Sequence, residues 1–87
     1  MDLADLQFVT AAVDAGNFAR AALVLGLHAS TISRRIARLE DELGLTLFER
    51  NRAGVRLTPS GQTVMRHIRR VLAEVDAVKA AGHHNGL

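Results

Sequence analysis

The chain has 87 residues, of which 48% are hydrophobic and none is cysteine, and its formal net charge is +2. This length suits one small domain, the hydrophobic content excludes intrinsic disorder, and the lack of cysteine excludes disulfides and thiolate metal sites. The opening "MDLADLQF" is acidic, unlike a signal peptide, and no apolar stretch is long enough to cross a membrane, so we expect a soluble, cytoplasmic domain.

The first predicted helix starts after Asp2, whose side chain can accept hydrogen bonds from free backbone N–H groups, and runs to about Ala15. Its apolar residues recur at the spacing of one helix face, at Leu3, Leu6, Val9 and Val13. Gly16 is expected to end this helix in the left-handed conformation of a C-cap.

The second and third predicted helices follow each other closely. Asn17 can cap the short helix "FARAALVLG", which ends at Gly26, and the third helix covers residues 30–43. Ala22, Gly26 and Ile32 fit a helix-turn-helix, because a small residue, a turn glycine and a branched apolar residue let two helices pack closely. A generic helical hairpin remains an alternative at this point.

The third predicted helix has two chemically different faces. Its core face carries Ile32, Ile36, Leu39 and Leu43. The opposite face and its flanks carry small side chains and arginines, namely Ser30, Thr31, Ser33, Arg34, Ala37 and Arg38. So slim a face fits the DNA major groove, where arginine can bond guanine O6 and N7 and serine can contact bases or phosphates. Arg35 lies nearer the core edge, which predicts a phosphate or an intramolecular contact.

A change of period after residue 44 predicts a hairpin. In "LTLFERNRAGVRLT", Leu45 and Leu47, then Val55 and Leu57, indicate two short strands around a loop from Asn51 to Gly54. Three arginines lie in or beside this hairpin: Arg50, Arg52 and Arg56. We interpret the hairpin as a wing whose tip can place an arginine in the minor groove.

A long fourth helix is predicted from Pro59 to about Ala81, because Thr58 is a favourable cap and proline a favourable first residue. Gly82 is expected to close it, which leaves residues 82–87 as a flexible tail. Apolar residues in steps of four and three form the narrow seam of a coiled coil: Val64, Ile68, Val71, Val75 and Val78. Met65 and Leu72 lie beside the seam and can pack onto the parent domain.

We therefore expect a mainly α-helical fold with a winged helix-turn-helix at residues 1–58, a linker helix at 59–81 and a tail. The five seam residues of the fourth helix, together with Met65 and Leu72, form the predicted homodimer interface. A monomer in which this stripe is ordinary core remains the alternative.

Positive charge is concentrated in the middle of the chain. Residues 28–70 contain nine arginines against four acidic residues, a net charge of +5. A solvated basic surface would explain this simply, but the guanidinium fork also matches phosphate oxygens, which favours nucleic acid as the partner.

The chain resembles the N-terminal DNA-binding domain of LysR-type transcriptional regulators of bacteria. The resemblance rests on "GNFARAA", "STISRRIARLEDELGLTLFER" and "VRLTPSGQ", which contain S-x-x-S-R-x-I-x-x-L-E, L-F-x-R and L-T-x-x-G. It implies a winged helix-turn-helix that reads promoter DNA as a dimer, with the long linker helix forming the dimer contact. Pairing of two copies through the fourth helix would set both third helices on one side of the DNA, which suits an inverted-repeat site. The resemblance further implies that Ser33 and Arg34 make the major-groove contacts, with Ser30 and Thr31 beside them, and that Arg50 holds a phosphate.

The sequence departs from the family pattern in three places. His28 and Ala29 stand where the family usually has serine and glutamine, so the third helix loses a good cap and position 29 can contact only a thymine methyl. The wing-tip arginine is displaced by one position, with Arg52 followed by Ala53. The family's effector-sensing domain is absent from this chain, so no effector ligand is expected on it.

Other functions are less compatible with the sequence. His28, His67, His83 and His84 do not share one helix face, so we expect no metal. No nucleophile–base pair or phosphate-binding glycine loop predicts an enzyme or a cofactor. Winged helices of the molybdate-responsive or multidrug-responsive kinds fit the motifs less well. The remaining alternative is a winged-helix protein-interaction or dimerisation module without specific DNA binding, whose apolar interface would tolerate salt that weakens DNA binding.

Overall fold

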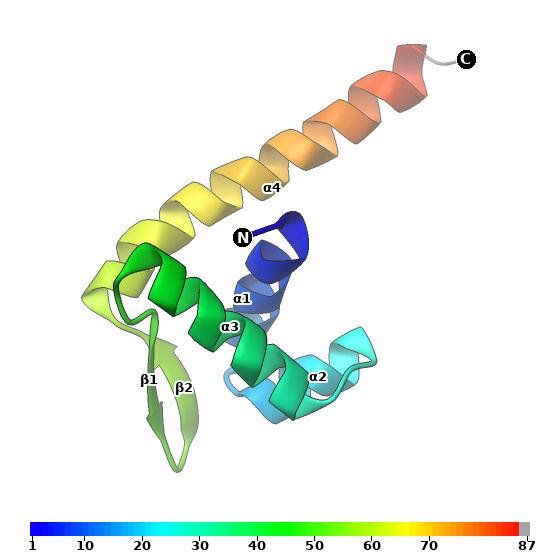
Figure 1. Ribbon diagram of the computed structural model, residues 1–87. Helices are drawn as coiled ribbons and strands as arrows, with labels where there is room; N and C mark the ends of the chain where they lie inside the picture. The colour runs from blue at the N-terminus through cyan, green and yellow to red at the C-terminus, as the bar shows by residue number, and fades with distance from the viewer. Residues whose placement is uncertain (86–87) are drawn as a thin grey trace.

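The structure, a computed structural model, describes residues 1–85 (Figure 1). Three helices form the body, a two-stranded hairpin extends from it, and a long helix crosses it and projects beyond. The elements in chain order are α1 (Leu3–Ala15), α2 (Phe18–Leu25), α3 (Ala29–Leu43), β1 (Phe48–Asn51), β2 (Gly54–Leu57) and α4 (Pro59–Asn85). The mainly helical, winged helix-turn-helix architecture predicted from the sequence is confirmed.

Local side-chain caps explain where the first helices begin. Asp2 accepts from the Asp5 N–H at 2.9 Å, and the Asp5 carboxylate accepts from the Asp2 N–H at 3.1 Å, which is a complete capping box. Asn17 accepts from the Arg20 N–H at 2.6 Å and so caps α2. His28 makes no side-chain capping bond to α3, as its poor capping chemistry predicted.

The core lies where α1, α2 and α3 meet and is closed by parts of the hairpin and α4. Its buried apolar residues are Leu6, Val9, Ala12, Ala21, Ala22, Ile32, Ile36, Leu39, Leu47, Phe48, Met65 and Ile68. The predicted core face of α3 is correct except at its end, because the last turn passes the edge of the body and leaves Leu43 38% exposed. Phe18 and Phe48 pack edge to face, with ring centroids 5.6 Å apart.

The wing is an antiparallel pair in which Phe48 faces Leu57 and Arg50 faces Val55. The prediction placed the first strand too early. Strand β1 begins at Phe48, and Leu47 before it is fully buried in the core. Its apolar character therefore reflects packing rather than strand alternation. The connecting turn is only two residues long, between Asn51 and Gly54.

The wing is fixed to the body at both ends. The Glu40 carboxylate of α3 accepts from the backbone N–H groups of Leu47 and Phe48, at 2.6 and 3.3 Å, where the chain enters β1. In β2 the Val55 N–H donates to the Gly16 carbonyl at 2.9 Å. Gly54 has φ 136°, and a Cβ there would collide with the same carbonyl oxygen, so this close approach requires glycine.

Helix α4 is longer than the sequence suggested. It continues through Gly82 to Asn85, a length of 27 residues, so the predicted end at Ala81 was wrong. A single exposed glycine costs a helix only about 1 kcal/mol, which the preceding turns can offset. Residues 86–87 of the predicted tail lie outside the described residues. In Figure 1 the first half of α4 lies beside the body and the second half projects away from it.

None of the helices described is by itself long and apolar enough to span a membrane. By length and composition α1 and α2 pass such a test only as a pair, across a bend of 120°.

Candidate nucleic-acid interface

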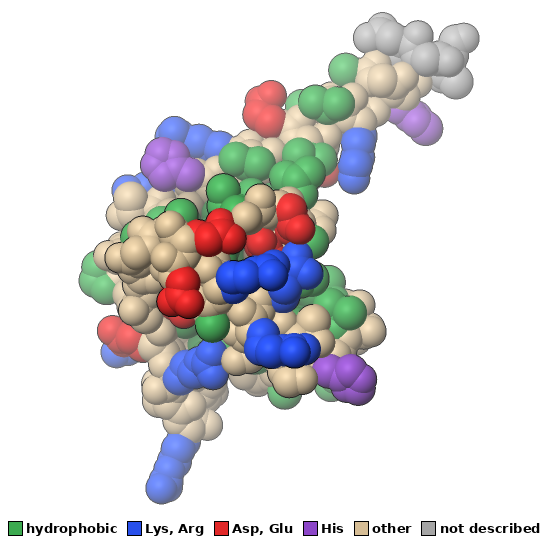
Figure 2. Space-filling view, viewed as in Figure 1, with side chains coloured by type: hydrophobic (Ala, Val, Ile, Leu, Met, Phe, Trp, Pro, Cys, Tyr) green, Lys and Arg blue, Asp and Glu red, His purple; other side chains and the backbone are tan. Residues whose placement is uncertain are grey.

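The outward face of α3 presents the arginines and hydroxyl groups that the sequence singled out. Ser30, Arg34, Ala37 and Arg38 are exposed, while Thr31 and Ser33 are half-buried on its flanks. The Arg34 side chain folds back along the helix, and its Nε donates to the Ser30 carbonyl at 3.3 Å. Figure 2 shows Lys and Arg side chains along α3 and out to the tip of the hairpin. Among residues 1–85, neither Arg34 nor Arg38 forms an ion pair with a carboxylate.

Arg50 connects the wing to α3. One Nη of Arg50 donates to the Ser33 hydroxyl oxygen at 3.0 Å, and the guanidinium carbon lies 4.6 Å from the centre of the Phe18 ring. A strand, the start of α2 and the outer flank of α3 therefore meet at one guanidinium group. The predicted site residues Ser33 and Arg50 are thus brought into direct contact.

The other two wing arginines lie apart from Arg50. Arg52 is exposed in the turn between β1 and β2, where the Asn51 side chain accepts from the Ala53 N–H at 2.8 Å. Arg56 donates to the Glu49 carboxylate opposite it at 3.1 Å. Because strand side chains alternate, Arg56 and Glu49 point away from the face that carries Arg50.

Arg35 is directed into the molecule rather than outward. Its Nε donates to Asp5 at 2.7 Å, its Nη2 donates to Asp2 at 3.1 Å, and its guanidinium lies 5.2 Å from the centre of the Phe8 ring. The hydrogen bond to Asp5 raises the pKa of Arg35, and the N–H of Asp5, followed by the charge of Arg35, lowers the pKa of Asp2. Of the two roles predicted for Arg35, the structure places it in the intramolecular one.

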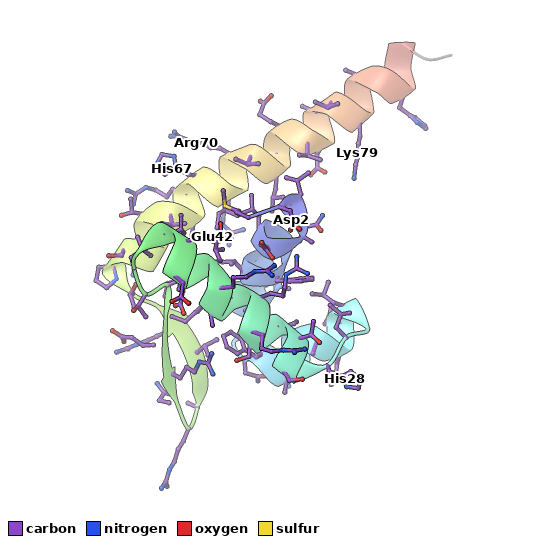
Figure 3. The ribbon with its side chains drawn as sticks, in the orientation of Figure 1. Asp2, His28, Glu42, His67, Arg70 and Lys79 are labelled. Atoms are coloured by element: carbon purple, nitrogen blue, oxygen red, sulfur yellow. The ribbon has the colours of Figure 1, made fainter. Side chains whose placement is uncertain are left out.

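Ala29 also lies apart from the outward face. It is half-buried and packs against the core, on the flank of α3 that carries Ser33. His28 precedes it, exposed at the start of α3 (Figure 3). A direct base contact by Ala29 stays a prediction, and its packed position allows it only the edge of such an interface.

The predicted dimer seam on α4 divides into two parts. Met65 and Ile68 are 4% and 3% exposed, because both pack into the core of their own domain. For Ile68 this corrects the expectation that it belongs to the seam. Val64, Leu72 and Val75 are half-buried, and only Val71 and Val78, 41% and 69% exposed, are exposed to solvent.

Three residues that support the interface were not recognised as such in the sequence. Glu40 holds the entry to β1, as described above. Thr58 Oγ1 donates to the Thr46 carbonyl at 2.5 Å and accepts from the Gly61 N–H at 2.9 Å, so it holds the start of α4 against the start of the wing. Gly61 lies against the Leu47 carbonyl, where a Cβ would collide. All three stand in the quoted motifs, and each acts through a backbone group distant in the chain.

Together, α2, the turn at Gly26 and α3 form a helix-turn-helix, and the hairpin that follows makes it a winged one. This architecture places the protein in the class of winged helix-turn-helix proteins. The chain belongs to the lysR family of bacterial regulatory helix-turn-helix proteins, which it matches over residues 3–62.

Relatives of known name support the same placement. The chain is 45% identical over 78 residues to the probable HTH-type transcriptional regulator LrrA of Synechococcus elongatus, a match that covers 90% of this chain and 26% of LrrA. It is 43% identical over 79 residues to the probable hydrogen peroxide-inducible genes activator of Mycobacterium xenopi, covering 91% of this chain and 42% of that protein. The chain thus spans about a quarter of the first relative and less than half of the second.

Solved structures share the whole fold. The DNA-binding domain of CbnR in its DNA complex superposes with a TM-score of 0.90 at 30% identity and covers 100% of both chains. The DNA-binding domain of BenM, in complex with benA site 1 DNA, gives 0.90 at 33% identity and covers 97% of this chain and 94% of that one.

Proposed function

We propose that this chain is the sequence-specific DNA-binding domain of a transcriptional regulator. Helix α3 lies in the major groove, and the hairpin contacts the minor groove and the backbone. The observation that carries this function is the pair of exposed arginines on α3, Arg34 and Arg38, which no carboxylate among the described residues neutralises. Arg35, by contrast, is neutralised by Asp2 and Asp5.

The side chains divide by role. Ser30, Thr31, Ser33 and Arg34 face bases, and Arg38 reaches a phosphate from the same helix. Arg50 and Arg52 hold the backbone and the minor groove, and Arg56, on the other face of the hairpin, adds only a diffuse positive charge. The CbnR and BenM domains that share the fold were both solved with DNA, which supports DNA binding through this fold.

The active form in this proposal is a homodimer that pairs through α4. The exposed Val71 and Val78 and the projection of α4 beyond the body support it. A two-fold dimer presents two copies of α3 to one side of the DNA, which suits an inverted-repeat site. A protein of this kind acts on nucleoid DNA in the cytoplasm, and an effector ligand is not assigned to this chain.

Selection of bound sequences from a random double-stranded DNA pool tests the function. We expect an inverted-repeat consensus, and an affinity that falls steeply as salt rises because counterions are released from phosphates. Arg34→Ala combined with Arg38→Ala should abolish enrichment. Arg70→Ala, on α4 away from the hairpin (Figure 3), is the matched control and should retain it. A native chain that enriches no sequence, or whose binding does not respond to salt, would contradict the proposal.

A further inference from the structure

The Ser33 hydroxyl, on the half-buried flank of α3, is held by a residue of the wing. Arg50 donates to its oxygen at 3.0 Å. The Arg50 guanidinium is in turn fixed over the Phe18 ring, which packs edge to face on Phe48. Aromatic packing therefore restricts the position of the Arg50 guanidinium, and the guanidinium restricts the orientation of the Ser33 hydroxyl.

This contact determines which way the hydroxyl can bond. Serine can donate one hydrogen bond and accept two, whereas arginine can only donate. The Ser33 oxygen therefore accepts from Arg50, and its own hydrogen points away from the guanidinium group. The second acceptor position of the oxygen lies beside this cation, where another N–H donor is disfavoured because its hydrogen also carries partial positive charge.

Among residues 1–85, no acceptor takes the hydrogen of the Ser33 hydroxyl. Hydroxyls in helices often donate to the carbonyl four residues earlier, as Thr10 does to Leu6 at 2.9 Å and Thr63 does to Pro59 at 3.4 Å. Within the described part of the chain, Ser33 donates to no such carbonyl and to no other acceptor. Its donor remains available on the half-buried flank next to Arg34.

We propose that Arg50 makes Ser33 act preferentially as a hydrogen-bond donor to DNA, and that the two residues together determine specificity at one base pair. In the major groove, guanine, adenine and thymine each offer an acceptor, and cytosine offers only its N4 amino donor. Ser33 therefore donates to any of the first three bases at the position it faces and disfavours cytosine. This inference rests on the proposed DNA-binding function and names what one of its residues reads.

Arg50 acts here as a positioning residue, whatever its remaining N–H groups contact. A residue that only added positive charge would change the affinity for every sequence by the same factor. The donor role instead changes the ratio between sequences, and only while Ser33 carries a hydroxyl. The two roles can thus be separated by measurement.

The test uses the selected site and its variants at each base pair. Ser33→Ala first identifies the pair that Ser33 faces, as the one at which base preference is lost. At that position we expect the native domain to disfavour cytosine by about 5- to 10-fold, the range of one neutral hydrogen bond. In Arg50→Ala this should fall to about twofold, because the Ser33 oxygen, no longer beside a cation, can accept from cytosine N4.

Matched variants keep the result interpretable. Arg50→Gln, whose amide offers a donor or an acceptor, should lose discrimination against cytosine as the alanine variant does. It also provides a second measurement if Arg50→Ala folds poorly. Arg50→Lys, another obligate donor, should restore the discrimination. Arg52→Ala removes one wing charge without touching Ser33 and should weaken all four base variants equally. In the Ser33→Ala background, Arg50→Ala should leave base preference unchanged.

The outcomes separate this inference from the function on which it rests. A native domain without any sequence preference overturns both. A native domain with a consensus, in which Arg50→Ala and Arg50→Gln weaken all four base variants by one common factor, overturns the donor assignment alone. So does a Ser33→Ala variant with unchanged preference at every pair, because Ser33 then contacts a phosphate or nothing.

Discussion

Arg35 Nε donates to Asp5 Oδ1 across the packing of α3 on α1, over 2.7 Å. Asp5 is 2% exposed, so its charge is removed from water almost completely and depends on this partner. Arg35 also reaches Asp2 in the same capping box. The most internal arginine of the recognition helix therefore holds that helix against α1 and sets the direction of its outer face.

Removing this arginine should unfold the domain more easily. Arg35→Ala leaves the Asp5 carboxylate buried without its cation, and we expect a clear loss in the free energy of unfolding. Arg38→Ala removes an exposed arginine from the same helix and should change it by less than about 0.5 kcal/mol. Urea unfolding followed by circular dichroism measures both. Equal values for the two variants would refute the structural role of Arg35.

Acid should weaken the same capping box. The pKa of Asp2 is lowered, chiefly by the hydrogen bond from the Asp5 N–H and then by the charge of Arg35. A lowered folded-state pKa means that this stabilisation is complete above the unfolded pKa of about 3.9 and is lost as pH falls through the folded value. Asp2→Asn can still cap but carries no charge.

We therefore expect Asp2→Asn to be less stable than the native chain at neutral pH, and the two to become equally stable once the pH has fallen through the lowered pKa of Asp2, where both side chains are uncharged. Urea unfolding of the two proteins over a pH series gives the difference. A gap between native and variant that stays constant from neutral to acid pH would show that the charge of Asp2 is unimportant.

Two glycines of α4 should respond oppositely to the same substitution. Alanine is the better helix former by about 1 kcal/mol at an exposed position, so Gly82→Ala, where a Cβ meets no neighbouring atom, should stabilise α4 slightly. At Gly61 a Cβ would collide with the Leu47 carbonyl, and we expect Gly61→Ala to destabilise the domain by about 1–3 kcal/mol through the shift it forces. Thermal unfolding of both variants decides, and a stabilised Gly61→Ala would mean that α4 does not approach the wing this closely.

Features coded by neighbouring residues could be predicted from the sequence. The caps at Asp2 and Asn17 and the left-handed glycines that follow α1 and α2 involve groups only a few residues apart. The periodicity of α3 similarly revealed its core, because a straight helix presents one stripe. These elements were predicted with nearly correct bounds.

Features that depend on how elements meet could not be predicted in this way. Nothing in the local pattern shows that Arg50 reaches Ser33, or that Val55 pairs with the turn at Gly16. The seam of α4 was misassigned at Ile68 for the same reason, since a helical stripe does not reveal whether its own domain or a partner covers it. The burial of Leu47 was likewise mistaken for strand alternation.

Substitution of an outward arginine on α3 and of one in the wing should change DNA binding in different ways. In the proposed function Arg34 contacts a base, so we expect Arg34→Ala to cost about 1–3 kcal/mol on the selected site and to relax the preference at one base pair. Arg52→Ala should weaken selected and unrelated sequences alike and reduce the salt dependence by about one counterion. Fluorescence anisotropy with the selected and with an unrelated DNA, over a salt series, measures both affinities and their salt dependence. If each of the two variants weakens binding to the selected and to the unrelated DNA by the same factor, this division of roles is refuted.

Dimerisation should depend on the exposed part of α4 rather than on Ile68. At about 1.5 Å per residue the helix is roughly 40 Å long, and the molecule extends 49 Å along its longest axis, so the second half of α4 has little of its own domain to cover it. Val71 and Val78 remain exposed on one side of this helix. A second copy of the helix packed along that side would bury both.

Val71→Glu combined with Val78→Glu should therefore produce a monomer that still folds, because neither side chain belongs to the core, whereas a charge at Ile68 would disrupt the core itself. Ala73→Glu combined with Ala77→Glu adds the same charges to exposed positions elsewhere around the helix and should leave the dimer intact. Sedimentation velocity at tens of micromolar, roughly the range in which weak association appears, compares the three proteins. A native chain that sediments as a monomer there, or a dimer that survives the two valine substitutions, would show that α4 does not pair through this side.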